Sequence, residues 1–259
     1  MVHDTWARRC TNYKFILKIP PNLVVKNNQV YYNDIDVGIQ SENILDPGIF
    51  NDTYRKLTDK VYKTLVYLVE KDNNYDWYLK ADDDTYIFVD NLRKFLNDKN
   101  SSEPVTYGFD LNRIVEKGYH SGGAGYIMSK EALTRIGTRL SKNYKSCPNR
   151  GFEDVDVAAC FRLVKVYPQS SRDYLGKERF HPLPIRNHYY GWFPKWFIKF
   201  SAQAPAKGLK CCSDESISFH YMKPSDLYRL DALVERYEKI KSKCNQELRF
   251  IDIAHELLG

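Results

Sequence analysis

The chain has 259 residues, of which 43% are hydrophobic and 28% charged, so it is long and apolar enough for a packed core and is neither disordered nor fibrous. Its net charge of +6 comes from 39 basic and 33 acidic residues spread along the chain, a pattern that predicts no nucleic-acid partner. No segment approaches the roughly 18 consecutive apolar residues of a membrane span. Without an internal repeat or linker, we expect one domain over residues 1–259.

The predicted elements alternate between helices and strands. Helical spacing of apolar residues is found at 52–70 with Asp52 as a cap, from Asn91 onward, at 130–140 with Ser129 as a cap, and at 153–163. Strand-like runs lie at 76–81, 85–89 and 164–167, and a charged helix at 227–243 is expected to be the terminal one. This order predicts an α/β fold with a largely parallel sheet.

Three adjacent carboxylates, Asp82, Asp83 and Asp84, follow the apolar run Trp77-Tyr78-Leu79. Carboxylates this close repel one another unless a cation neutralises them, and their oxygens are ligands that suit Mn²⁺ or Mg²⁺. Alternation along an extended chain points Asp82 and Asp84 the same way and Asp83 the other way. The alternative is a solvated acidic turn without a ligand.

Other candidate groups carry weaker signals. Glu153 and Asp154 begin a predicted helix, where they either compensate the helix dipole or supply a general base. The turn at Gly122 and Gly123 either lets backbone approach a ligand or is an ordinary tight turn. His220, in a strand-like run, is either a third metal ligand or a structural histidine.

Six cysteines include an adjacent pair, Cys211-Cys212, and none forms a Cys-x-x-Cys motif. Two glycosylation sequons start at Asn51 and Asn100. Together these features favour the secretory pathway.

Five sequence blocks in order resemble the β1,3-glycosyltransferase family. They are TWARRC at 5–10, WYLKADDDTY at 77–86, GYHSGGAGY with SKEAL at 118–133, SRD with GKERFHP at 171–182, and CCSD with SFHY at 211–221. The last three blocks resemble most the branch that transfers galactose to O-linked N-acetylgalactosamine.

The resemblance implies a single Rossmann-like nucleotide-sugar-binding domain of the GT-A type. It implies an inverting enzyme that uses UDP-galactose and Mn²⁺ or Mg²⁺ to galactosylate the 3-hydroxyl of N-acetylgalactosamine on Ser or Thr of glycoprotein acceptors. Such enzymes are type II Golgi membrane proteins with a lumenal catalytic domain, and many form homodimers. The chain starts close to the TWARRC block, so the membrane anchor, the stem and an opening strand of the family are expected to be missing.

Residue roles follow from the same resemblance. It assigns Asp84, Asp82 and His220 to the metal, Asp82 or Asp83 to the ribose, and Asp154 to the catalytic base. Trp6 and Arg9 match positions near the donor nucleotide, where Gly122 and Gly123 are also expected to approach ligand. Glu153, Tyr190 and Trp192 are expected at the acceptor. We expect disulfides Cys147–Cys160 and Cys211–Cys212, with other pairings open and with Cys10 and Cys244 left over.

Ala158 departs from the family, which usually has glycine there. One alternative is another β1,3-transferase, such as a fringe-like N-acetylglucosaminyltransferase. A second alternative is a non-catalytic, chaperone-like or inactive truncated relative, which the intact acidic motif argues against.

Overall fold

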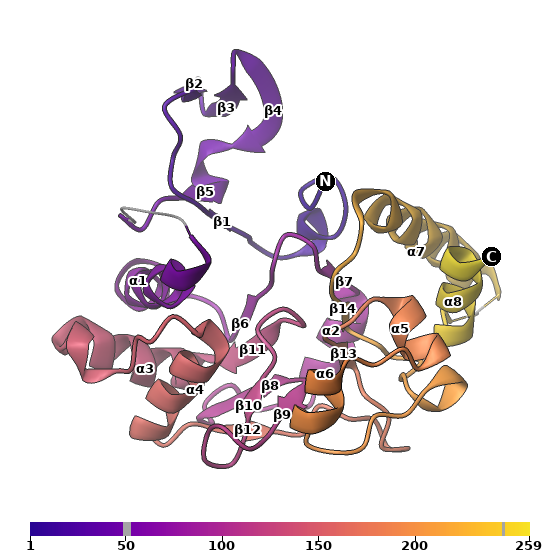
Figure 1. Cartoon of the computed structure of the whole chain (residues 1–259). Coiled ribbons are helices and arrows are strands. Elements are labelled where there is room, and N and C mark those ends of the chain that lie inside the picture. The colour runs from indigo at the N-terminus through magenta and orange to yellow at the C-terminus, as the bar shows by residue number, and fades with distance from the viewer. Residues whose placement is uncertain (49–52, 245–246) are drawn as a thin grey trace.

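A four-stranded mixed sheet lies at the centre of the computed structural model (Figure 1). The structure describes residues 1–48, 53–244 and 247–259, of which 241–244 are described by their backbone alone. The spatial order of the sheet is β12-β8-β11-β6, formed by β6 (Trp77–Lys80), β8 (Val105–Gly108), β11 (Tyr126–Ser129) and β12 (Tyr167–Gln169). Strand β11 runs antiparallel to β6 and β8, and β12 runs parallel to β8.

The predicted α/β class is confirmed, but the prediction of a largely parallel sheet is wrong. Between β8 and β11 the chain forms only the antiparallel pair β9 (Asp110–Leu111) and β10 (Tyr119–His120). This connection contains no helix, which is the usual crossover between parallel strands, and the chain returns antiparallel. The strand predicted at 164–167 also begins late, since β12 starts at Tyr167.

Three helices, α1 (Leu57–Lys71), α3 (Lys130–Lys142) and α4 (Glu153–Leu163), pack together beside this sheet (Figure 1). The helices predicted at 130–140 and 153–163 are confirmed as α3 and α4. The Ser129 hydroxyl accepts the Ala132 N–H at 3.0 Å, which caps α3 as predicted. The expected cap of the first helix, Asp52, and the sequon residue Asn51 lie outside the described residues.

A second, three-stranded sheet has the order β13-β14-β7, formed by β7 (Tyr86–Ile87), β13 (Phe180–His181) and β14 (Ser218–Phe219). Strand β14 is antiparallel to β7, with Phe219 opposite Tyr86. Because β7 follows the acidic triplet directly, this register brings the residue after Phe219 to that triplet.

Further helices flank the second sheet. They are α2 (Val89–Leu96), α5 (Ile185–Tyr190), α6 (Lys195–Phe200), α7 (Pro224–Cys244) and α8 (Phe250–Leu258). The helix predicted from Asn91 begins at Val89. The helix predicted as terminal is α7, and that prediction is wrong because α8 follows it and buries Phe250 against Phe219. Short 3₁₀ turns lie at Ala7–Arg9, Ser41–Asn43, Tyr54–Lys56, Tyr144–Ser146 and Gly208–Lys210.

Before α1, a small sheet not predicted from the sequence stands apart from the rest (Figure 1). It consists of β2 (Leu23–Lys26), β3 (Gln29–Tyr32) and β4 (Ile35–Gln40), with β1 (Phe15–Ile16) and β5 (Ile44–Leu45) paired in parallel beneath it. Both hairpin loops have two residues at positive φ, Asn27-Asn28 and Asn33-Asp34, as tight two-residue turns require.

The expected disulfides Cys147–Cys160 and Cys211–Cys212 are both present, and Cys10 is a free thiol. The side chain of Cys244 lies outside the described residues. Among the helices described, none has the length and apolar character needed to cross a bilayer.

Candidate active site

The acidic triplet forms a turn between β6 and β7, closed by a hydrogen bond from the Thr85 N–H to the Asp82 carbonyl at 3.2 Å. Within it, Asp82 and Asp84 face His220, whereas Asp83 is exposed. The shared direction predicted for Asp82 and Asp84 is therefore present, although a turn rather than a strand produces it.

His220 reaches this turn because β14 pairs with β7. Its Nε2 atom lies 3.1 Å from Asp84 Oδ1 and 3.8 Å from Asp82 Oδ2. The Met222 N–H donates to the Asp84 carbonyl at 2.8 Å and fixes the two segments together. Each of the three side chains offers one ligand atom within 4.8 Å of the others.

Two carboxylates and one imidazole form a donor set that fits a divalent cation such as Mn²⁺. Burial alone would raise the pKa of Asp84, but the hydrogen bond and charge of His220 outweigh it and lower that pKa. Asp84 is therefore ionised at neutral pH, and a bound cation would take over the role of the His220 charge.

The glycine turn packs directly under this cluster. The Thr85 hydroxyl donates to the Gly123 carbonyl at 2.7 Å, and the Ser218 hydroxyl donates to the Ala124 carbonyl at 2.5 Å. A Cβ atom on Gly123 would lie 2.0 Å from Cε1 of His220. Glycine at this position therefore makes room for the imidazole that faces the two carboxylates.

Lys80, the last residue of β6, joins the acidic turn to the second acidic pair. Its Nζ contacts an Asp82 carboxylate oxygen, donates to the Gly122 carbonyl at 3.2 Å, and lies 3.7 Å from Glu153 Oε2. Burial would lower the pKa of Lys80, but Glu153 and Asp82 outweigh it and raise that pKa. Lys80 was not among the predicted site residues, although its position two residues before Asp82 could have indicated it.

Glu153 and Asp154 begin α4 and differ in exposure. Glu153 is buried and accepts the Tyr126 hydroxyl at 2.8 Å, so its carboxylate faces Lys80 rather than solvent. Asp154 is half-buried, and one of its oxygens accepts the Val155 N–H at 2.8 Å. Burial raises the pKa of both carboxyls.

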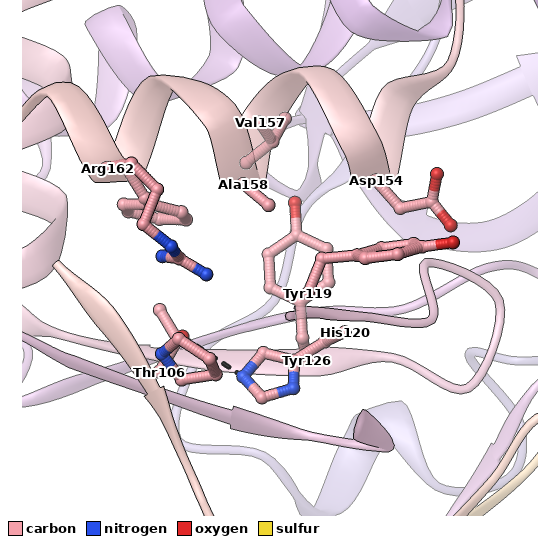
Figure 2. Close-up of a pocket in the computed structure, with 10 residues that line it drawn as sticks. Thr106, Tyr119, His120, Tyr126, Asp154, Val157, Ala158 and Arg162 are labelled. Atoms are coloured by element: carbon pink, nitrogen blue, oxygen red, sulfur yellow. Dashed lines mark hydrogen bonds between the residues drawn. The ribbon is translucent and has the colours of Figure 1, made fainter. Parts of the chain in front are cut away.

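Asp154 also borders a small pocket between α4 and the sheet. Figure 2 shows its carboxylate on one side, with Tyr119 and His120 of β10 and Ala158 of α4 among the other lining residues. His120 is fixed by a 3.0 Å contact between its Nε2 and the Thr106 hydroxyl. Burial raises the pKa of Tyr119 to about 12, so its hydroxyl stays protonated beside Asp154.

The other residues predicted for the site are Trp6, Arg9, Tyr190 and Trp192, and they make different contacts. Trp6 is buried, and its indole N–H donates to the Thr85 carbonyl at 2.9 Å, next to the acidic turn. Arg9 is bound to Asp231 of α7. Tyr190 and Trp192 are exposed and stack with ring centroids 4.7 Å apart, so they form an aromatic surface at the end of α5.

Residues 47–119 match the family model described as Galactosyltransferase. The chain is 37% identical over 170 residues to glycoprotein-N-acetylgalactosamine 3-beta-galactosyltransferase 1 of Xenopus laevis. The matched region covers 62% of this chain and 46% of that relative. The mixed α/β architecture is consistent with a glycosyltransferase domain of the GT-A type.

Two further relatives carry other names. The chain is 38% identical over 104 residues to human chondroitin sulfate synthase 3, covering 35% of this chain and 11% of the relative. It is 30% identical over 155 residues to UDP-GalNAc:beta-1,3-N-acetylgalactosaminyltransferase 1 of Mus spicilegus, covering 50% and 45%. The chain spans less than half the length of each of these three curated relatives.

Proposed function

We propose that this chain is the catalytic part of a metal-dependent, inverting β1,3-galactosyltransferase. Its donor is UDP-galactose, and its acceptor is the 3-hydroxyl of N-acetylgalactosamine O-linked to Ser or Thr of glycoproteins. The observation that carries the proposal is one continuous network, in which Lys80 links the Asp82, Asp84 and His220 cluster to the second acidic pair. The similarity to the Xenopus relative supports the choice of donor and acceptor.

Asp82, Asp84 and His220 would hold Mn²⁺ or Mg²⁺. When bound, this cation supplies positive charge that stabilises the UDP leaving group. Exposed Asp83 remains free to hydrogen-bond the ribose. Trp6 supports the nucleotide side of the site through the acidic turn, because its indole N–H bonds the Thr85 carbonyl.

Asp154 acts as the general base. It takes the proton from the acceptor 3-hydroxyl as that oxygen attacks the anomeric carbon from the face opposite UDP. One displacement inverts the configuration from the α-linked donor to the β-linked product, without a covalent intermediate. The raised pKa of Asp154 makes it a stronger base than an ordinary aspartate.

Lys80 and Glu153 act as positioning residues between the two halves. The Lys80 ammonium balances Asp82 and Glu153, so the charges beside Asp154 are fixed before substrate binds. Glu153 acts on the acceptor side of the site through Lys80, because its own carboxylate is buried. The stacked rings of Tyr190 and Trp192 offer the apolar surface that a sugar face prefers.

The donor is the least constrained part of the proposal. The relatives from human and Mus spicilegus are named for other sugar products, and a fringe-like N-acetylglucosaminyltransferase has the same need for a cation and a base. A non-catalytic relative has no such need. The complete set of cation ligands with Asp154 favours an enzyme.

We further propose a lumenal Golgi location in a membrane-anchored protein, with homodimerisation. Two disulfides support an oxidising compartment, and the sequon residue Asn100 is exposed and open to glycosylation.

The testing experiment is a mass-spectrometric transfer assay with an O-linked N-acetylgalactosamine peptide and Mn²⁺. UDP-galactose, UDP-N-acetylgalactosamine and UDP-N-acetylglucosamine are supplied separately, each with and without a chelator, and a fucose-bearing peptide is the second acceptor. A hexose gain that the chelator abolishes is expected only with UDP-galactose. An N-acetylhexosamine gain instead would replace the donor, and no gain from any pair by folded protein would favour the non-catalytic alternative.

A further inference from the structure

A second cluster of side chains that could bind a metal lies at the second sheet, next to the acidic-turn cluster, since the His220 N–H donates to the His181 carbonyl at 3.0 Å. It consists of His181 at the end of β13, His188 on α5 and Cys212, and each offers one ligand atom within 4.8 Å of the others. All three side chains are buried, with residue exposures of 0%, 3% and 0%. Nothing in the proposed transfer reaction uses them.

The two imidazoles are incompletely satisfied where they lie. His181 Nε2 contacts the Ser216 hydroxyl at 3.0 Å, but among the described residues its Nδ1 and the Nε2 of His188 have no hydrogen-bond partner. Native proteins rarely leave buried polar nitrogens unpaired. Burial lowers the pKa of His188 to about 3. The His188 ring is therefore neutral, as a metal ligand must be.

The third member is held in a different chemical state. Cys212 is bonded to its neighbour Cys211, and a disulfide sulfur is a poor ligand because the thiolate is the metal-binding form. Leu209 and Lys210, immediately before the pair, are exposed, whereas both cysteines are buried, so reduction requires local opening of this segment. The adjacent cysteines, conspicuous in the sequence, thus lie where they control one ligand of the cluster.

We infer that His181, His188 and Cys212 form a binding site for a Zn²⁺-like cation that becomes available when the Cys211–Cys212 disulfide is reduced. A dithiol supplies two electrons and two protons, its own disulfide forms, and both cysteines become thiols. Cys212 then releases its proton to solvent as its sulfur binds the cation. Two imidazoles and one thiolate suit zinc, whereas the oxygen-rich cluster at the acidic turn suits Mn²⁺ or Mg²⁺.

The test uses Co²⁺ as the probe, because a thiolate bound to Co²⁺ gives a charge-transfer absorption that carboxylate and imidazole ligands do not give. The matched pair is Cys211→Ser and Cys212→Ser, both in a Cys10→Ser background. Each variant breaks the disulfide, but only Cys211→Ser leaves a free thiol inside the cluster. All other cysteines are the same in the pair, so a difference reports Cys212.

Cys211→Ser is expected to show the absorption without reductant and to lose it when Zn²⁺ is added. Cys212→Ser is expected to show no such absorption, because it lacks the sulfur ligand of the cluster. The wild type should behave like Cys211→Ser only after dithiol treatment. Equal absorption in the two variants, or absorption in neither, would overturn the inference.

A second comparison keeps the test decisive if a cysteine variant does not fold. Reduced wild-type protein is compared with reduced His188→Gln, which retains both thiols but loses one imidazole. Circular dichroism establishes that both are folded before Co²⁺ is added. The absorption is expected to fall in His188→Gln, and unchanged Co²⁺ affinity would exclude a site that includes this histidine.

Discussion

Replacing Gly123 by alanine tests whether the glycine turn fixes the position of His220. The added Cβ would lie 2.0 Å from Cε1, 2.3 Å from Nδ1 and 2.6 Å from Nε2 of that ring. Non-bonded carbon atoms prefer separations of about 3.5 Å, so the ring must move by about 1.5 Å. The Thr85 hydroxyl bonds the Gly123 carbonyl at 2.7 Å and opposes movement of the turn instead.

A shift of this size removes the 3.1 Å contact between His220 Nε2 and Asp84 Oδ1. We expect Mn²⁺ binding, measured by calorimetry, to weaken by about 10- to 100-fold, as when an orienting partner of a metal ligand is lost. The free energy of unfolding should fall by about 1–3 kcal/mol, the usual cost of overpacking.

A double-mutant cycle separates this steric effect from general damage. In a His220→Ala background the imidazole is gone, so Gly123→Ala should cause almost no further loss of stability. If Gly123→Ala binds Mn²⁺ as tightly as the wild type, the argument that this glycine makes room for a metal ligand is refuted.

Three other predictions concern individual carboxylates. Asp84→Ala should abolish Mn²⁺-dependent UDP binding, whereas exposed Asp83→Ala should retain Mn²⁺ affinity; equal loss in both would contradict the assignment. Asp154→Asn should keep UDP binding but lose transfer by about 100- to 10,000-fold, and because a base works deprotonated, the wild-type rate should rise with pH through the raised pKa of Asp154. Burial raises the pKa of Glu178 from its usual 4.5 to about 7, despite the nearby Arg172, so its contribution to stability is present below pH 4.5 and lost as pH rises through 7. Relative to Glu178→Gln, the wild-type unfolding free energy measured with urea should fall by about 3 kcal/mol across that interval. The same pH dependence of the unfolding free energy in both proteins would contradict this.

Local signals in the sequence predicted the parts of the fold that depend on local chemistry. Ser129 caps α3 as expected, since its hydroxyl needs only the N–H three residues later. The acidic triplet was also recognised, and its geometry follows from a short turn. His220, in contrast, could be assigned only through the family resemblance, because its proximity to Asp84 depends on the pairing of β14 with β7.

Other features of the fold and the site were not predicted from the sequence, each for a different reason. The sheet direction depends on how the chain returns between β8 and β11, which helix and strand periodicity does not encode. The hairpins of β2, β3 and β4 were not predicted, although Asn27-Asn28 and Asn33-Asp34 are residues that tolerate the positive φ of a two-residue turn. Lys80 was overlooked because a lysine in a strand usually indicates a solvent-facing position, whereas here it compensates buried carboxylates.

The distant origin of His220 also has a consequence for biosynthesis. During translation, Asp82, Asp84 and Asp154 are all made well before β14. A nascent or prematurely terminated chain that ends before β14 therefore has the carboxylates and the base but no imidazole to complete the cluster. The capacity to hold a cation through all three ligands thus arises only after β14 has been made and has paired with β7.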